Sequence, residues 1–294
     1  MPELPEVETV RAELSQWLPG KTIATIKILH PRAVRRNSGP SLRSAKNPLI
    51  GAKITGVSRR GKFLWLTFNR PFALVIHLGM SGQVHLPKTP APRSTHLRAL
   101  ITFTSGKEEL HFDDQRTFGY LAVEKLVADP YVNPETAEEI PQSITHIAPD
   151  LMEVCNNEIA CYSCEDLSAK ICTRKSEIKR VLLNQSVVSG VGNIYADEGL
   201  WAAKIHPETL AYALAPKEVL TLLKALHAIM VRAIKFGGAS IDGQFKRVNG
   251  ESGYFNVQLN AYRRAGEPCP RCGTLIQRLR FMNRSSHLCP TCQK

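Results

Sequence analysis

The residues at the start of the chain, Met1-Pro2-Glu3, could perform covalent chemistry. Pro2 is small enough that removal of Met1 is expected, which would leave the ring nitrogen of the proline as a free secondary amine. Such an amine can attack an aldehyde-like carbon and form an iminium, as lysine does in a Schiff base. A proline also suits a plain helix start, because apolar residues recur at helical spacing from Val7 to Leu18 before Pro19-Gly20. From these residues alone, a catalytic and a structural role both stay open.

Four cysteines near the end of the sequence have the spacing of a metal site. Cys269 and Cys272 form one C-x2-C pair, Cys289 and Cys292 form another, and sixteen residues separate the pairs. Two such pairs joined by a β-hairpin hold a tetrahedral zinc ion. With four protein ligands the ion would support structure and would not activate water. The sequence therefore predicts one structural Zn²⁺. Disulfides are the alternative, and the lack of an apparent signal peptide argues against them.

The other four cysteines lack this arrangement. Only Cys161 and Cys164 are spaced as C-x2-C, and Cys155 and Cys172 form no second pair. Free cysteines are among the most buried residues of proteins, so we interpret all four as buried or reduced free thiols. A second metal or a redox pair is the alternative.

Basic residues are concentrated in two blocks of the chain. The net charge is +12, and between Glu13 and Glu108 there are sixteen Lys/Arg and no acid. Residues 269–294 carry five more basic residues, again without an acid, whereas ten acidic residues lie between Glu124 and Asp166. Clustered positive charge of this kind indicates a polyanionic partner, and we favour nucleic acid over a solvated basic surface that binds nothing specific.

The elements that must position these residues change in type along the chain. Short β-rich runs separated by Gly and Pro predict a sandwich or a barrel; they are residues 22–29, 50–57, 62–68, 72–78, 97–103 and 109–112. Prolines between 130 and 149 indicate a connector. Helices are expected next, at residues 176–183, 194–203 and 217–235, followed by an exposed loop at 239–256. No apolar run suggests a membrane span or a signal peptide, so a cytoplasmic location is expected.

Six motifs in this order resemble the formamidopyrimidine-DNA glycosylases, a family of bacterial-type base-excision repair enzymes. They are PELPEVETV at 2–10, RRGKFL at 59–64, HLGMSG at 77–82, DQRTFG at 114–119, GVGNIYADE at 190–198 and the four-cysteine module. The related endonuclease VIII branch usually begins PEGPE, so Leu4 favours the formamidopyrimidine branch.

The resemblance implies an α+β multidomain fold. It would comprise an N-terminal catalytic β-sandwich with a leading helix (1–135), an acidic Pro-containing linker (136–164), a helix-two-turn-helix domain with a lesion loop (165–256) and a zinc finger (257–294). The implied function is removal of oxidised purines, such as 8-oxoguanine and formamidopyrimidines, from double-stranded DNA. The implied enzyme is a monomeric glycosylase and abasic-site lyase that associates with the nucleoid through DNA.

The resemblance also implies roles for particular residues. Pro2 would attack C1′ of the damaged nucleotide, and Glu3 would act as general acid/base. The resulting iminium acidifies the C2′ proton, so β- and then δ-elimination would cut the strand. Lys62 would donate a proton and bind phosphate, and Arg284 would assist δ-elimination and contact phosphate. Simple phosphate binding by Lys62 and Arg284 is the alternative.

A second set of residues would bind DNA. Met80, Arg116 and Phe118 match the residues that fill the space left by a flipped nucleotide, and Arg116 would face the orphaned cytosine. Burial of Met80 and Phe118 in the core is the alternative. Asn193 would bind phosphate at a helix start, and Lys175 and His96 are further contacts.

Two departures from the family pattern concern loops. The damaged-base loop reads GGASIDGQF at 237–245 and lacks a basic residue near Asp242, and Asn283 replaces a glycine before Arg284. The remaining alternatives are an endonuclease VIII-like enzyme for oxidised pyrimidines and a non-catalytic zinc protein that binds damaged DNA.

Overall fold

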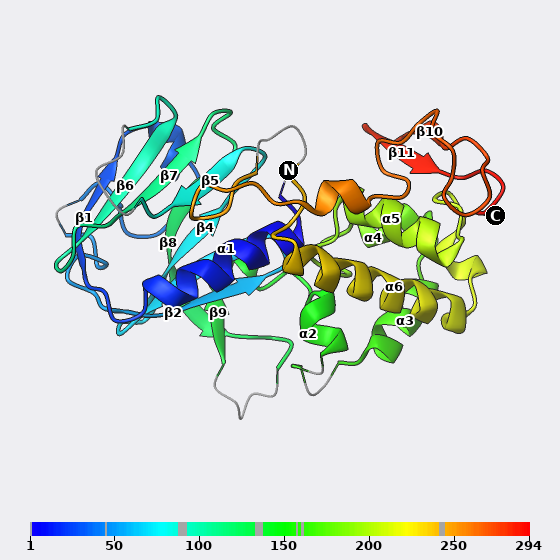
Figure 1. Cartoon of the computed structure of the whole chain (residues 1–294). Helices are drawn as coiled ribbons and strands as arrows, with labels where there is room; N and C mark the ends of the chain where they lie inside the picture. The colour runs from blue at the N-terminus through cyan, green and yellow to red at the C-terminus, as the bar shows by residue number, and fades with distance from the viewer. Residues whose placement is uncertain are drawn as a thin grey trace. The chain divides into compact units, whose positions relative to one another are not determined.

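The chain forms two compact units. The computed structural model describes residues 2–44, 46–87, 93–132, 138–156, 158–159, 162–240 and 245–294 (Figure 1). The first unit contains the described residues of 1–130, 134–146 and 236–254, and the second those of 131–133, 147–235 and 255–294. The sequence placed 236–254 with the helical domain, but in the structure this segment packs on the first unit, where carboxylates of the leading helix bind its backbone.

Helix α1 (Leu4–Trp17) opens the first unit, as the sequence predicts. Pro5 occupies the first turn, where the missing N–H costs nothing. The side chain of Glu6 reaches back to accept a hydrogen bond from the backbone N–H of Glu3 (2.8 Å). Val7, Val10 and Leu14 lie on one face of the helix and are buried in the core of the unit.

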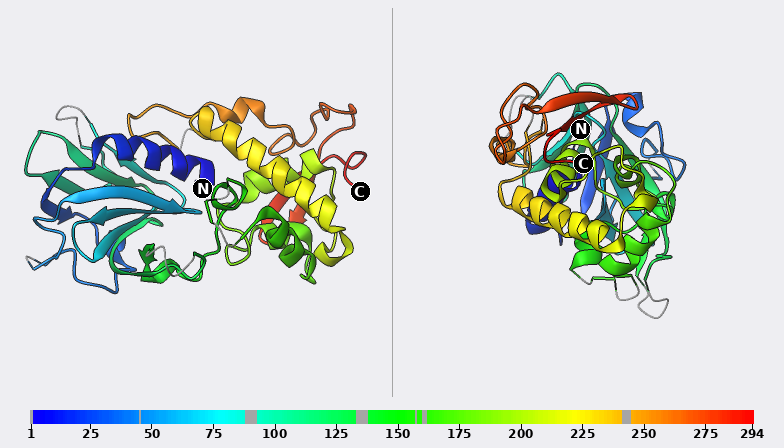
Figure 2. Two further views of the ribbon diagram at one scale, coloured as in Figure 1. Left: turned by 90° about the horizontal axis from the view of Figure 1, so that it is seen from below. Right: turned by 90° about the vertical axis from the view of Figure 1, so that its right-hand side faces the viewer.

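The remainder of the first unit is a β-sandwich, which confirms the predicted fold class. Among the described residues, one sheet has the order β1-β6-β7-β5 and the other β2-β3-β4-β8-β9. Apolar residues of both sheets and of α1 form one core. Figure 2 shows α1, in dark blue, lying alongside strands of this unit. The strands are β1 (Ile23–Ile28), β2 (Ile54–Arg60), β3 (Phe63–Phe68), β4 (Phe72–His77), β5 (Gly82–His85), β6 (Leu97–Phe103), β7 (Glu109–Asp114), β8 (Tyr120–Ala128) and β9 (Glu139–Pro141).

Three strands were not expected from the sequence, namely β5, β8 and β9. β5 is four residues long and begins at a glycine, so it offers too short a β-rich run to detect. β8 carries five buried residues in succession because it lies inside its sheet between β4 and β9. The first four of these residues, 120–123, are all apolar, and so short an apolar run does not distinguish a buried strand from a helix.

The second unit is helical and contains α2 (Leu151–Cys155), α3 (Cys164–Cys172), α4 (Ile178–Leu182), α5 (Asn193–Ala203) and α6 (Pro216–Lys235). The long helix α6 packs against α2, α3 and α5 (Figure 2). Its buried residues, among them Val219, Leu223 and Leu226, recur at helical spacing on one face. In the described part of the chain, no helix has the length and apolar character needed to cross a membrane.

A zinc module completes the second unit. Strands β10 (Gln277–Phe281) and β11 (Arg284–Leu288) form an antiparallel hairpin in which Phe281 pairs with Arg284. The hairpin lies between the two C-x2-C pairs, as the sequence predicts. Met282 adopts a positive φ of 53° in the tight turn between the two strands. The exposed Arg284 is the first residue after this turn.

The interpretation of the second cysteine group as free thiols is wrong for two of its members. Cys155, at the end of α2, forms a disulfide with Cys164, at the start of α3. The helices bring the two residues together through packing on α6, a contact that cysteine spacing does not reveal. Cys172 is free and partly buried, and burial raises the pKa of its thiol. Cys161 lies outside the described residues.

Candidate DNA interface and catalytic residues

Pro2 and Glu3 lie together at the N-terminus of α1. Both are buried, and Glu3 is the residue that precedes the first helical position. Pro2 therefore lies just ahead of the N-terminus of the helix. The carboxylate of Glu6 connects this start to the loop after α6, because its Oε1 accepts a hydrogen bond from the backbone N–H of Ala239 (2.7 Å).

Lys62 lies in the tight turn between β2 and β3. Gly61 supplies the positive φ of 55° that this turn requires. The two arginines of the RRGKFL motif hold the hairpin in place. Arg59 donates to Glu8 of α1 (2.9 Å), and Arg60 forms a buried ion pair with Asp129, in which its Nη1 lies 2.9 Å from Oδ1. Lys62 is therefore presented by a hairpin that is fixed to α1 and to Asp129, the residue that follows β8.

Met80, Arg116 and Phe118 lie on two neighbouring turns of the first unit. The turn before β5 carries Met80, and the turn before β8 carries Arg116 and Phe118. Gly79 has a φ of 62°, and a Cβ there would lie 2.5 Å from the backbone of Phe118, so only glycine allows the two turns to approach. The turns meet without a side chain between their backbones.

Asp114 joins the same two turns by hydrogen bonds. Its Oδ1 accepts from Ser81 Oγ (2.6 Å), its Oδ2 accepts from the N–H of Gly119 (2.7 Å), and Ser81 Oγ in turn accepts from the N–H of Arg116 (3.0 Å). The carboxylate is buried, with 1% of the residue exposed. Sequence reasoning did not select Asp114 or Ser81, although both stand within the quoted motifs.

Exposure excludes a core position for these apolar residues. Met80 is 36% exposed and Phe118 42%, although both are large hydrophobic residues. The guanidinium of Arg116 lies 5.3 Å from the ring centroid of Phe118, and Arg35 donates to the carbonyl of Phe118 (2.6 Å). A packed arginine–phenylalanine pair beside an exposed methionine is suited to stacking against bases.

His77 lies at the centre of an aromatic ladder behind these turns. Its ring lies 4.9 Å from that of Phe63 and 5.2 Å from that of Tyr120, across three adjacent strands. Its Nδ1 accepts a hydrogen bond from the N–H of Gly79 (3.1 Å). Burial, together with the positive charges of Arg36, Lys62 and Arg35, lowers the pKa of His77 to about 4. The imidazole is therefore neutral at pH 7.

This lowered pKa predicts an acid-sensitive fold. The unfolded chain protonates His77 near its ordinary pKa of 6.5, whereas the folded chain resists protonation until about pH 4. Stability should fall by up to about 1.4 kcal/mol per pH unit as the pH decreases through this window, with no contribution above it. Urea unfolding of wild type and His77→Asn between pH 4.5 and 7.5 measures the difference, since Asn retains an acceptor for Gly79 without titrating. If the free energy of unfolding depends on pH in the same way for both proteins, the lowered pKa of His77 is contradicted.

The segment 236–254 packs on α1 at two points. Besides the Glu6 contact, Glu13 accepts from the N–H of Val248 (2.7 Å) and pairs with Arg247. Phe245 and Val248 belong to the core of the first unit. The expectation of an exposed loop at 239–256 is therefore wrong at these positions, because carboxylates on α1 supply partners that local sequence does not show. Asp242 lies outside the described residues.

Asn193 and Arg284 are neighbours in the second unit. Asn193 is the first residue of α5, after the glycine-rich turn that the sequence predicts, and its Nδ2 donates to the carbonyl of Ser285 (2.9 Å). Arg284 precedes Ser285 in β11 and is exposed. Glu198, five residues further along α5, accepts backbone N–H groups of Asn260, Ala261 and Tyr262. Helix α5 therefore organises the chain that leads into the zinc module.

The two remaining DNA-contact predictions fall on accessible positions. Lys175 is exposed just before α4, and His96 is partly buried before β6, with its Nδ1 3.4 Å from Nη2 of Arg98. Pro2, Glu3, Lys62, Met80, His96, Arg116 and Phe118 thus belong to the first unit, and Lys175, Asn193, Arg284 and the zinc ligands to the second.

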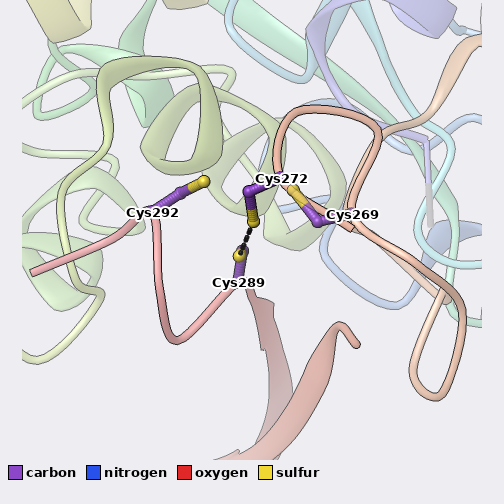
Figure 3. A group of neighbouring side chains, drawn as sticks. All are labelled: Cys269, Cys272, Cys289 and Cys292. Carbon is purple, nitrogen blue, oxygen red and sulfur yellow. Dashed lines mark hydrogen bonds between the residues drawn. The ribbon is translucent and has the colours of Figure 1, made fainter. Parts of the chain in front are cut away.

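The four cysteines of the zinc module converge on one point (Figure 3). The sulfur atoms of Cys269, Cys272, Cys289 and Cys292 all lie within 4.8 Å of one another. A set of four thiols at this separation fits a tetrahedral zinc ion and leaves no position for a reactive water. Hydrogen bonds from Thr274 lower the pKa of Cys272 to about 6, and Trp201 Nε1 donates to Cys269 Sγ (3.4 Å). The four cysteines hold a single structural zinc.

The fold and the site define the class of protein: a zinc-containing DNA-binding protein built from a basic β-sandwich and a helical unit. Three family models match the chain. They are the formamidopyrimidine-DNA glycosylase N-terminal domain at residues 1–121, the formamidopyrimidine-DNA glycosylase H2TH domain at 156–244, and the zinc finger found in FPG and IleRS at 266–294.

Known proteins are similar to this chain over its full length. Formamidopyrimidine-DNA glycosylase of Acidothermus cellulolyticus is 46% identical, with 100% of this chain and 97% of the relative covered, and that of Mycobacterium avium is 47% identical with 100% and 98% covered. A Lactococcus lactis FPG mutant in complex with Fapy-dG DNA has a TM-score of 0.82 at 33% identity, and MutM in complex with carbocyclic 8-oxo-G DNA has 0.81 at 33%; each comparison covers both chains completely. The chain belongs to the formamidopyrimidine-DNA glycosylase family.

Proposed function

We propose that this protein removes oxidised purines from duplex DNA and cuts the strand at the abasic site that remains. The observation that carries the proposal is the exposed Met80, Arg116 and Phe118 set, held on two turns by a buried aspartate. A base inside a duplex cannot be reached, so an enzyme that acts on it must extrude the nucleotide and fill the space. Methionine and phenylalanine fill such a space, and arginine can bind the unpaired partner base.

The proposed chemistry begins at Pro2. Its neutral amine attacks C1′ of the damaged nucleotide, the new N–C bond replaces the glycosidic bond, and the base departs. Opening of the sugar gives an iminium, and Glu3 is the proposed general acid/base for the proton transfers at the sugar. Loss of the C2′ proton then breaks the C3′–O bond, and a second elimination breaks the C5′–O bond. Hydrolysis of the iminium restores the free amine.

Basic residues would hold the strand during these steps. Lys62 is the proposed proton donor and phosphate ligand of the first unit, and Arg284 assists the second elimination from the zinc hairpin. Asn193, Lys175 and His96 are proposed phosphate contacts. Such contacts should accelerate the reaction by keeping the sugar aligned with Pro2, because correct positioning of the reacting groups lowers the activation barrier.

Incision assays test the substrate class directly. Duplexes carrying 8-oxoguanine opposite cytosine and thymine glycol opposite adenine are incubated separately with the protein, and cleaved strands are quantified. Faster cleavage of the 8-oxoguanine duplex is expected. Preference for thymine glycol would support the endonuclease VIII-like alternative. Binding without cleavage of either duplex, and without a borohydride-trapped adduct, would support a non-catalytic damage-binding protein.

Replacement of Arg116 should relax the choice of partner base. Discrimination by one arginine amounts to about 1–3 kcal/mol, so Arg116→Ala should reduce the preference for 8-oxoguanine·C over 8-oxoguanine·A by roughly tenfold. Single-turnover excision rates on both duplexes give the ratio. Lys53→Ala is the matched control, because it removes an exposed positive charge from the same unit. An unchanged ratio in Arg116→Ala would remove Arg116 from the recognition of the partner base.

Location and assembly stay predictions. We expect a monomer that works in the cytoplasm and associates with the nucleoid through DNA. Imaging of C-terminally labelled wild type and of the Asn193→Ala variant, which should bind DNA more weakly, measures the fraction of each protein that is located at the nucleoid. Light scattering of the purified protein measures the assembly state.

A further inference from the structure

Lys179 is a fully buried lysine that has no part in the proposed chemistry. It lies in α4 with no exposed surface, and its Nζ lies 2.6 Å from Oδ1 of Asp197, which is equally buried. The ammonium also donates to Ser286 Oγ (3.0 Å) and to the carbonyl of Ser285 (3.2 Å). Desolvation of such a pair is expensive, and the contacts offset this cost only when the geometry is good.

Asp197 extends the same network into the zinc hairpin. Its Oδ1 accepts a second hydrogen bond from Ser286 Oγ (3.1 Å). Its Oδ2 accepts from the backbone N–H of His287 (2.9 Å) and contacts the ring nitrogen Nδ1 of the same residue (3.0 Å). One buried carboxylate on α5 therefore binds both backbone and side chains of β11.

The network fixes the backbone next to two proposed phosphate ligands. The carbonyl of Ser285 accepts from Lys179 and also from the side-chain amide of Asn193 (2.9 Å). Arg284 is the residue immediately before Ser285. The two hydrogen bonds to the carbonyl of Ser285 therefore fix the backbone from which the exposed side chain of Arg284 projects. Asn193 itself starts the helix that carries Asp197 one turn later. The three elements α4, α5 and β11 are thus joined at the point where both ligands emerge.

Apolar residues of similar volume would hold these elements together at least as strongly as a buried ion pair. A charged pair with several directional hydrogen bonds differs in that it accepts only one register of β11. We propose that Lys179, acting with Asp197, is a positioning residue that sets Arg284 relative to Asn193 for binding to the DNA backbone. We call this pair the Lys179–Asp197 clamp; it rests on the phosphate-binding roles proposed above.

The test compares Lys179→Met with Lys224→Met, which removes the same charge from an exposed site on α6 of the same unit. Affinity for a duplex with a tetrahydrofuran site is measured over a range of salt concentrations. Lys179→Met should bind about tenfold more weakly, with a salt slope reduced by about one phosphate contact. Lys224→Met should stay within twofold of wild type.

Analysis of the cleavage products distinguishes displacement of Arg284 from a general loss of structure in the variant. On a natural abasic duplex, Lys179→Met should accumulate the β-elimination product at the expense of the δ-product, because Arg284 is displaced. Borohydride trapping at saturating DNA should stay within twofold of wild type, because Pro2 belongs to the other unit. Zinc content should remain one ion per chain, and amide exchange at residues 285–288 should become faster.

Two further variants keep the outcome clear if Lys179→Met folds poorly. Ser286→Ala removes one neutral hydrogen bond and should shift affinity and product ratio in the same direction by a smaller factor. Lys179→Met/Asp197→Leu replaces the clamp by apolar residues and should recover thermal stability while keeping the DNA defect.

The clamp is overturned if folded, zinc-loaded variants show wild-type affinity, salt slope and product ratio. It is also overturned if the double variant recovers DNA binding together with stability, because the role would then be purely structural. If the wild-type protein forms no trapped adduct, the proposed lyase activity is contradicted. DNA affinity and amide exchange would still test the positioning role of Lys179 and Asp197.

Discussion

An extension that blocks the amine of Pro2 should reduce borohydride trapping on an abasic duplex by about 10³-fold or more, the scale on which loss of a nucleophile acts. The reason lies in the local structure. Pro2 comes just before Glu3, the N-cap of α1, and the hydrogen bond from the N–H of Glu3 to Glu6 holds the chain in place beside it. An amide at this nitrogen cannot form an iminium, so both base removal through Pro2 and strand cleavage should be lost.

The measurement compares one protein with an uncleavable N-terminal tag and the same protein with a C-terminal tag. Mass spectrometry of the second protein establishes whether Met1 has been removed, and trapping reports the nucleophile. Pro5→Ala is the matched control, since it changes a proline of the same helix start but leaves the amine of Pro2 free. Salt-sensitive DNA binding should persist in the blocked protein. Trapping by the blocked protein at the rate of the free one would assign the nucleophile to another residue.

Removal of the zinc should cause the second large effect, a loss of DNA affinity of about 100-fold, equal to a few phosphate contacts. The module has almost no core of its own. Its apolar cluster consists of buried Cys269, Ile276 and Cys289, with Trp201 and Cys292 packed against them. Because this cluster is so small, the metal should supply most of the folding free energy of the module. Without it, β11 and Arg284 lose their position, whereas the β-sandwich keeps its own core and should remain folded.

Cys289→Ser is the variant of choice because Cys289 is fully buried at the metal position. Zinc content, duplex affinity and the fluorescence of Trp201, which contacts Cys269, report the loss together. Cys172→Ser changes a free cysteine of the same unit and should behave as wild type. A zinc-free Cys289→Ser protein with unchanged affinity would show that the hairpin takes no part in binding.

Motifs that depend on neighbouring residues could be predicted from the sequence. The C-x2-C pairs, the proline at the start of α1 and the glycine-rich turn before Asn193 are local features, and the structure contains all of them. The strands of the sandwich were predicted where a β-rich run was long enough between Gly and Pro breaks, as in β6. The disulfide between Cys155 and Cys164 and the buried strand β8 could not be predicted, because both follow from packing between distant segments.

Local sequence was enough to reveal the groups that could do chemistry: Pro2 beside Glu3, four thiols at zinc spacing and two basic blocks. Tertiary structure alone decided how these groups are supported. Asp114 joins the Met80 and Phe118 turns, Glu6 connects the start of α1 to the segment after α6, and Lys179 with Asp197 ties β11 to α5. Each of these contacts joins residues that are distant in sequence. Their partners are chosen by burial, because a buried polar group must find a hydrogen bond wherever the fold supplies one.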